Sequence, residues 1–349
     1  MQRLVSSIAA DAVTSHGVRL PPGDVVGKSR AGRPIRGYRI GRGKLKISLL
    51  SGCHADEPVG SRLLEGFIAA LTADKDLRWL LDEFEWWILP HINPDGAVAN
   101  QEWQRTDVGS FDIGDYLLHV ERELPGEDIE FGFSCCEGER PCRPENQAAI
   151  GWWKSDPRPF SLHVSLHGMA FAAGPWFLVE PAWQDRLAPF MTHCRAAVEK
   201  LGYRLHDVER QGEKGFQRLA PGFCTRPNSK AMREFFLERD EPATAALFRP
   251  SSMEWMRSFG GDPLTLVSEM PLFLLPDVGK ELGPPDPAAE RWHRQLSDWR
   301  KRVRATHDAE ELRRKAAEAG LQAMPIDDQM ALQWKMIALG CDTVRGLLA

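Results

Sequence analysis

The sequence lacks an excess of basic residues. Lys and Arg number 44 against 49 Asp and Glu, which gives a formal net charge of −5 at pH 7. Proteins that bind nucleic acid or anionic lipid without regard to sequence need positive charge to neutralise phosphates. We therefore expect neither a nucleic-acid partner nor a membrane partner, and a small or peptide-like partner fits better.

Long hydrophobic runs and a pattern of paired cysteines are also missing. No stretch of about eighteen uncharged apolar residues occurs, and Asp11 interrupts the short apolar patch near the N-terminus, so no spanning helix and no signal peptide are expected. Seven cysteines, an odd number, fit reduced thiols better than a disulfide framework. These features predict a soluble, cytoplasmic protein.

The composition that is present is that of a globular chain with an α/β pattern. Hydrophobic residues make up 43% and charged residues 27%, enough apolar material for a large core. Helical spacing is expected at 58–71 and 146–154, between short apolar runs that read as buried strands. Those runs are 45–51, 84–92, 162–166 and 264–267. The alternation predicts a mixed, largely parallel sheet flanked by helices.

The chain divides into three parts by composition. Residues 1–275 carry the α/β pattern, and 276–287 are rich in Pro and Gly and read as a linker. Residues 288–349 show helical spacing and are predicted to form an extension that packs on the main domain or mediates self-association as a homo-oligomer. Within the first part, the long polar stretch 108–144 is predicted to be a functional loop.

Three side chains that suit a zinc ion follow two of the predicted strands. His54 and Glu57 come directly after the run 45–51, and His167 ends the run 162–166. Taken alone, His-x-x-Glu describes many ordinary polar turns, and a lone histidine often sits satisfied in a core. Together the three residues lie where open α/β sheets bind ligands. Catalytic zinc sites use three protein ligands and leave a fourth position open, so one Zn²⁺ per chain is expected.

Two further residues have the chemistry that zinc-dependent hydrolysis requires. Glu269 ends the fourth predicted strand, and a carboxylate there can take a proton from water and pass it to a leaving nitrogen. Arg105 can donate hydrogen bonds to an oxyanion as it develops. Each residue alone has an ordinary interpretation, a strand-end ion pair or a surface arginine.

The ordered motifs resemble those of the zinc carboxypeptidase family over residues 22–275. Gly27-Lys28-Ser29 with Gly32-Arg33-Pro34-Ile35 resembles the entry segment of the family. Asn93-Pro94-Asp95-Gly96 resembles its Asn-Pro-Asp-Gly turn. His54, Glu57 and His167 match its metal ligands, and Glu269 matches its general base. The resemblance implies that Arg105 stabilises the oxyanion and that Asp112 orients the first metal histidine.

Two departures from the family concern substrate recognition. The pair that grips a terminal carboxylate, Asn-Arg, is replaced here by Gly114 and Asp115, and none of the three tyrosines matches the family's substrate-capping tyrosine. Asp115 is therefore predicted to face the substrate pocket and to prefer an amine. Arg122 and Arg143 are the candidates for binding a carboxylate in place of the missing arginine.

The sequence as a whole predicts a zinc metallopeptidase or amidase. Its substrate is expected to be a peptide or peptide-like amide, for which a bacterial cell-wall fragment is one candidate by analogy. A second enzyme hypothesis is an N-acyl amino acid deacylase. A third hypothesis, a non-catalytic zinc-binding protein, is disfavoured because all three ligands and the base are present.

Overall fold

The computed structural model describes residues 20–105, 109–124, 126–134, 142–207, 209–210, 212–280, 282 and 286–348. The N-terminal patch, for which no signal peptide is predicted, lies outside these residues. Within them, no helix is both long enough and apolar enough to cross a bilayer.

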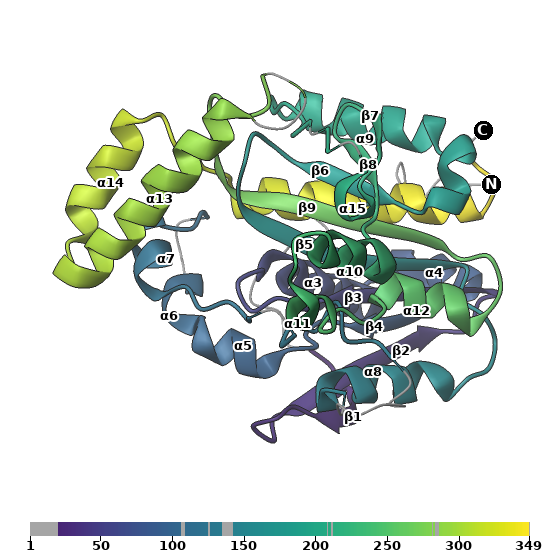
Figure 1. Ribbon diagram of the computed structural model, residues 1–349. Coiled ribbons are helices and arrows are strands. Elements are labelled where there is room, and N and C mark those ends of the chain that lie inside the picture. The colour runs from purple at the N-terminus through teal and green to yellow at the C-terminus, as the bar shows by residue number, and fades with distance from the viewer. Residues whose placement is uncertain are drawn as a thin grey trace.

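A mixed sheet forms the centre of the molecule (Figure 1). Its strands are β1 Asp24–Lys28, β2 Pro34–Gly41, β3 Leu45–Ser51, β4 Phe84–Leu89, β5 Leu162–Ala172, β6 Trp176–Val179, β7 Arg218–Ala220, β8 Phe223–Thr225, β9 Leu264–Leu274 and β10 Gln322–Ala323. The strand order is β1-β2-β4-β3-β5-β9-β6-β8-β7, and β10 pairs with β9. The four central strands β4, β3, β5 and β9 are mutually parallel, which confirms the predicted fold class.

Helices cover both faces of this sheet. They are α3 Val59–Ala73, α4 Arg78–Glu83, α5 Pro94–Ala99, α6 Gln101–Gln104, α7 Ile113–His119, α8 Pro144–Lys154, α9 Ala188–Lys200, α10 Ser229–Leu237, α11 Pro242–Ala245, α12 Ser252–Phe259, α13 Pro287–Thr306, α14 Ala309–Glu318 and α15 Ile326–Val344. The described residues also form the short 3₁₀ turns η1 Lys75–Leu77, η2 Pro181–Arg186 and η3 Glu213–Gly215.

Side chains along each central strand point alternately to the two faces of the sheet, and both faces are covered by helices. On β4 the neighbouring side chains Trp86 and Trp87 are both fully buried, yet they belong to different hydrophobic clusters. Successive strand residues point to opposite faces, so a strand buried on both sides is apolar throughout. Helices α3, α9 and α15 pack on the Trp86 face, while α8 and α12 pack on the Trp87 face.

The predicted strands are present, with shifted ends. The first matches β3 residue for residue, and the second stops at Leu89. The third and fourth continue well past their predicted ends, to Ala172 and Leu274, because β5 and β9 stay paired over their whole lengths. Polar side chains such as His167 and Glu269 interrupt the apolar run without ending the strand, so hydrophobicity alone placed the ends too early.

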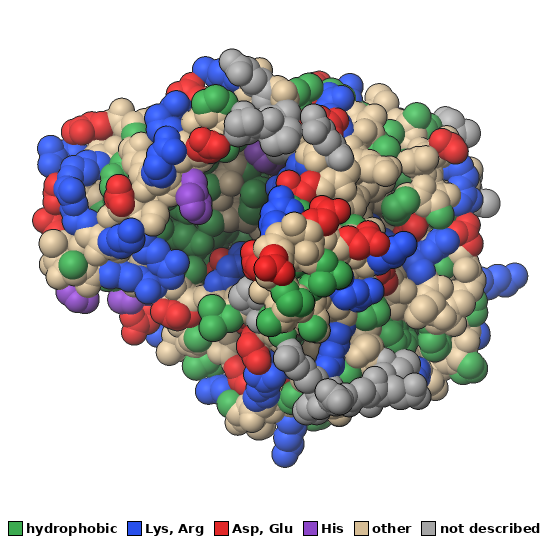
Figure 2. Space-filling model, viewed as in Figure 1, with side chains coloured by type: hydrophobic (Ala, Val, Ile, Leu, Met, Phe, Trp, Pro, Cys, Tyr) green, Lys and Arg blue, Asp and Glu red, His purple; other side chains and the backbone are tan. Residues whose placement is uncertain are grey.

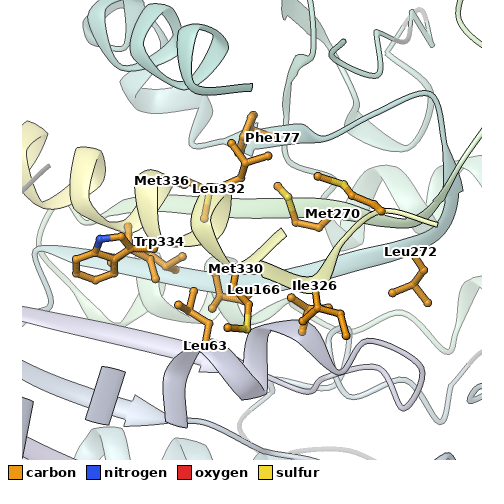
Figure 3. Packing of buried hydrophobic residues seen from close by; sticks show 14 of the residues in the cluster. Leu63, Leu166, Phe177, Met270, Leu272, Ile326, Met330, Leu332, Trp334 and Met336 are labelled. Atoms are coloured by element: carbon orange, nitrogen blue, oxygen red, sulfur yellow. The ribbon is translucent and has the colours of Figure 1, made fainter. Parts of the chain in front are cut away.

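The C-terminal helix α15 is part of the central core. Figure 3 shows its side chains, among them Met330 and Trp334, packed against Leu63 of α3 and Leu166 of β5. Trp334 is 2% exposed, and its ring lies 5.0 Å from that of Phe67. The predicted C-terminal extension therefore contributes a helix to the same core as the strands before the linker. Self-association through this extension would have to use α13 and α14, which are more exposed than α15.

One side of the molecule is hollowed. Figure 2 shows the hollow between the α13–α14 pair and the region of α10, with hydrophobic side chains on its floor and charged side chains around it. Helix α14 also packs on α7, and α13 supports the end of α7 through Arg300 and Arg304, which donate hydrogen bonds to the carbonyl of Val120. The C-terminal helices thus hold the segment that leaves α7.

We expect Trp334→Ala to lower the free energy of unfolding by about 3–5 kcal/mol, because truncating a buried aromatic side chain leaves a cavity. Leu237→Ala, at a side chain that is 55% exposed, should change it by no more than about 0.5 kcal/mol. Urea denaturation of both variants measures the difference. A loss under about 1 kcal/mol for Trp334→Ala would show that α15 is not part of the folding core.

Candidate metal centre

The turn after β3 carries the first two candidate ligands. Gly52 adopts φ +73°, in the left-handed region that favours glycine, and the chain turns there before His54 and Glu57. Strand β5 runs parallel to β3, with Leu166 opposite Ser51, so His167 follows at the same edge of the sheet. Neighbouring parallel strands therefore bring the two histidines together.

The three predicted ligands converge on one point. Glu57 lies between the histidines, with Oε1 2.8 Å from Nδ1 of His54 and Oε2 2.9 Å from Nδ1 of His167. The two Nδ1 atoms are 3.2 Å apart. A tetrahedral zinc ion with bonds of about 2.0–2.1 Å separates its ligand atoms by about 3.3 Å. The separation of the two Nδ1 atoms is close to this value, and the donor set of two imidazole nitrogens and one carboxylate suits zinc.

Each histidine is held from behind by a carboxylate. Nε2 of His54 lies 3.1 Å from Asp128, and Nε2 of His167 lies 3.1 Å from Glu130. An acceptor at the outer nitrogen fixes the tautomer in which the other nitrogen is free to bind a metal, and it makes the imidazole a more basic ligand. Both Nδ1 atoms are therefore oriented for coordination.

Sequence reasoning missed Asp128 and Glu130. Glu130 is buried, and its Oε1 accepts hydrogen bonds of 3.0 Å from both the backbone N–H and the hydroxyl of Ser252, at the start of α12. The sequence feature that could have identified them is a pair of carboxylates separated by one apolar residue, Asp128-Ile129-Glu130, inside the predicted functional loop. Only the fold shows which histidine each one contacts.

The same loop contributes Arg122 and Glu123. Arg122 contacts Asp56 at 3.1 Å and Glu57 at 3.4 Å, so its guanidinium group lies beside the ligand carboxylate. Glu123 accepts a hydrogen bond from the backbone N–H of Ala55 at 3.1 Å and another from the amide of Asn93. This segment therefore ties the metal-binding turn to the Asn93-Pro94-Asp95-Gly96 turn.

Glu269 lies next to the cluster on β9. It is the strand partner of His167, and no residue in the described part of the chain donates a hydrogen bond to its carboxylate. Burial raises the pKa of Glu269 to about 8, an effect that the charge of His167 opposes and that of Glu57 reinforces. Glu269 is thus close to the ligands, and without metal its carboxyl group is largely protonated at pH 7. The positive charge of a bound metal would lower this pKa and favour the carboxylate that can act as a base.

Three predicted residues lie elsewhere. Arg105 is exposed and donates to Gln101, while the neighbouring Gln104 reaches the metal-binding turn instead, with its amide 3.0 Å from the carbonyl of Ala55. The structure therefore does not bring Arg105 to the site. Arg122 is instead the arginine that lies beside the ligand residue Glu57.

Asp112 and Asp115 also take different positions from those predicted. Asp112 caps α7, and Arg313 of α14 pairs with Asp112 at 2.8 Å and with Asp115 at 3.0 Å. Asp128, not Asp112, contacts His54. Asp115 therefore already has a cationic partner in Arg313, and its charge is not left free for an amine of the substrate.

A second group of potential ligands shares His167. Cys53, Glu130 and Nε2 of His167 are also close enough to hold a metal. All three are buried, and Glu130 already accepts hydrogen bonds from Ser252. Burial also raises the pKa of the Cys53 thiol, which disfavours the thiolate that binds metals. The group of His54, Glu57 and His167 is the better metal site, because His54 is partly exposed and gives access to a substrate.

Protonation of the site depends on its metal. Burial disfavours charge on His54, but Glu57 and Asp128 outweigh burial and raise the pKa of His54 to about 10. Burial also disfavours charge on His167, but the charge of Glu57 and hydrogen bonds with Cys53 and Glu130 raise its pKa well above the usual value. Without metal, the surrounding carboxylates therefore favour the positively charged form of both imidazoles, with a proton on each ring nitrogen.

Comparison with known proteins points to one family. Residues 23–176 match the family model described as zinc carboxypeptidase. Zinc carboxypeptidase A 1 of Drosophila melanogaster is 32% identical over 94 residues, 23% of this chain and 22% of that protein, so the match spans about a fifth of the relative. Among solved structures, carboxypeptidase A of Helicoverpa armigera has a TM-score of 0.49 at 13% identity, covering 93% of this chain and 68% of that one. A metallo-carboxypeptidase of Burkholderia cenocepacia has a TM-score of 0.44 at 15% identity, covering 94% and 66%.

Zinc binding at pH 7 should release on the order of two protons, one from each imidazole, since only the neutral ring binds metal. The affinity should rise as the pH is raised towards the pKa of His54, about 10, and fall as the pH is lowered. Calorimetric titrations in two buffers with different ionisation enthalpies measure the release. A binding enthalpy that is independent of the buffer would contradict the assignment of these protons.

Asp128→Asn and Glu130→Gln should each weaken zinc binding by about 10-fold to 100-fold, because each removes the charge behind a ligand histidine. Asp112→Asn, a matched substitution at a residue that faces Arg313, should leave the affinity unchanged. Competition with a chelator measures all three. The opposite order, with Asp112→Asn the weakest binder, would restore Asp112 as the residue that orients His54.

Proposed function

We propose that the protein is a zinc metallopeptidase that cleaves a peptide or peptide-like amide bond, a proposal supported by the match of residues 23–176 to the zinc carboxypeptidase family model. The observation that carries the proposal is the convergence of His54 Nδ1, His167 Nδ1 and the Glu57 carboxylate, with Glu269 directly opposite His167. Three ligands beside an independent carboxylate are what metal-assisted hydrolysis needs.

His54, Glu57 and His167 would hold the zinc ion, which would supply Lewis-acid chemistry for the amide carbonyl and for water. Glu269 accepts the proton of the attacking water and passes it to the leaving nitrogen. Arg122 donates hydrogen bonds to the oxyanion, a role for which its fixed position between Asp56 and Glu57 prepares it. Asp128 and Glu130 keep the two imidazoles in place throughout.

Finer assignments of substrate and location are proposals of the same kind. Hydrolysis of a cell-wall peptide amide and deacylation of an N-acyl amino acid both use this chemistry, and the Asn93 to Gly96 turn, tied to the metal turn by Glu123, favours the peptidase side. A non-catalytic zinc-binding protein would have no need of the carboxylate of Glu269. The proposed cytoplasmic location rests on the odd number of cysteines.

Glu269→Gln should lower kcat by about 10²-fold to 10⁴-fold, because the amide cannot take the proton, while zinc content stays unchanged. The assay uses zinc-loaded protein and three substrate sets: peptides with free C-termini, γ-linked cell-wall peptides and N-acyl amino acids. Retention of wild-type turnover by Glu269→Gln on a substrate that the protein cleaves would remove Glu269 as the base.

Arg122→Lys should cost about 10²-fold to 10³-fold in kcat, because lysine keeps the charge beside Asp56 and Glu57 but not the donor geometry. Arg105→Lys is the matched control, and it should have the wild-type rate because Arg105 points to Gln101. If Arg105→Lys is the slow variant and Arg122→Lys is not, the oxyanion role belongs to Arg105.

A further inference from the structure

Strand β5 carries a row of buried polar side chains on one face of the sheet. His163, Ser165 and His167 occupy alternate positions, with a leucine or valine between them, so all three point the same way. The ring of Trp153 in α8 lies 5.7 Å from that of His163, which places the row on the face that α8 and α12 cover. Polar groups buried among apolar side chains cost free energy unless they are hydrogen-bonded, so this row depends on its partners.

The carboxylate of Glu130 links the members of this row. Its Oε2 lies 3.1 Å from Nε2 of His167 and 3.4 Å from the hydroxyl of Ser165, which is itself 2.9 Å from that nitrogen. Its Oε1 accepts hydrogen bonds of 3.0 Å from the backbone N–H and the hydroxyl of Ser252. His163 reaches the same carboxylate indirectly, because its Nε2 lies 3.1 Å from the Ser252 hydroxyl. A continuous path of hydrogen bonds therefore runs from His163 to a candidate metal ligand.

The number of protons available gives this path a direction. An ionised carboxylate only accepts hydrogen bonds, so Ser252 uses its one hydroxyl proton for Glu130 and must accept from Nε2–H of His163. Burial lowers the pKa of His163 to about 4, so its ring is neutral at pH 7 and Nδ1 carries no proton. Nδ1 then accepts from the hydroxyl of Ser48, 2.9 Å away on β3 and directly opposite in the sheet. Both ring nitrogens of His163 thus have partners, and only one tautomer suits them.

A second acceptor competes for the hydroxyl proton of Ser252. The sulfur of Met253 lies 3.1 Å from the Ser252 hydroxyl, although a thioether is only a weak acceptor. A hydroxyl that itself accepts a hydrogen bond becomes a stronger donor, because neighbouring hydrogen bonds polarise one another. The bond from His163 therefore favours donation of the Ser252 proton to Glu130, and it helps to keep that carboxylate fixed behind His167.

We propose that His163 is a positioning residue for the metal centre, acting through Ser252 and Glu130 to hold His167 with its Nδ1 directed at the metal. The proposal rests on the metal site of the proposed function, and it extends that site to the far end of the row on β5. It also explains why an imidazole is buried in an apolar cluster, where a leucine or phenylalanine would pack without the cost of burying polar atoms.

Competition with a chelator on the full-length protein measures zinc affinity without any turnover. The double variant Ser48→Ala, His163→Phe should weaken zinc binding by about fivefold to tenfold, in the range of one lost hydrogen bond. His163→Gln keeps an N–H that can donate to Ser252, so it should bind zinc within about twofold of wild type. Thr265→Val is the matched control and should leave the affinity unchanged. Thr265 is the buried strand partner of His163 on β9, but its hydroxyl donates to Glu180, outside the path.

Combining these substitutions with Ser252→Ala separates the hydrogen-bonded path from packing. Ser252→Ala alone should weaken zinc binding at least as much as the double variant does. In Ser252→Ala protein, the substitutions at Ser48 and His163 should then cause no further loss, because the path to Glu130 is already broken. Losses that simply add would show that His163 acts through packing alone, and they would overturn the proposal. Unchanged zinc affinity in the double variant would overturn it as well.

The wild-type protein provides a readout that does not depend on any variant folding. Long-range proton–nitrogen correlation spectra show which ring nitrogen of each histidine carries a hydrogen, and the signal that disappears in His163→Gln belongs to His163. We expect the Nε2–H tautomer of His163 at pH 7, with and without zinc, whereas the Nδ1–H tautomer would contradict the proposed direction of the path. None of these measurements requires Glu269 or hydrolysis, so a failure of the proposed function is distinguishable from a failure of this inference.

Discussion

The contact between Glu57 and the two histidine Nδ1 atoms is the interaction on which the rest of the site depends. The Nδ1 atoms of His54 and His167 lie 3.2 Å apart, and both are close to the carboxylate of Glu57. Lone pairs at this distance repel one another, so the arrangement requires protons on the nitrogens or a cation bound between them. The surrounding structure keeps that arrangement, because Asp128 and Glu130 hold the opposite side of each ring. A zinc ion would replace protons at a site whose shape the protein already holds.

The helix at the end of the chain reaches this centre from the other side. Gln333 of α15 is buried and donates hydrogen bonds to the backbone carbonyl of His167 at 3.3 Å and to the hydroxyl of Ser268 at 3.1 Å. Gln333 thus contacts a ligand residue and the residue before Glu269. The C-terminal segment supports both strands that supply the chemistry, so it is more than an appendage of the α/β domain.

Features that depend on local sequence were predictable. The strands, and the placing of His54, Glu57 and His167 after or within them, follow from apolar runs with polar residues at their ends. Contacts between distant segments were not. Arg313 meets Asp112 across 201 residues, and Glu130 meets His167 across 37. The resemblance to the family implied that Asp112 orients His54, and no local feature of the sequence distinguishes the carboxylate of Asp112 from that of Asp128. The fold shows that Asp128 is the residue in contact with His54.

X-ray absorption at the zinc edge tests the central claim most directly, since it reports which atoms bind the metal. We predict that the zinc ion has only nitrogen and oxygen neighbours, at about 2.0–2.2 Å. His54, His167 and Glu57 would supply these atoms, and a water molecule would occupy the remaining position. A sulfur neighbour at about 2.3 Å would place the metal between Cys53, Glu130 and His167. That result would contradict the site from which the mechanism is derived.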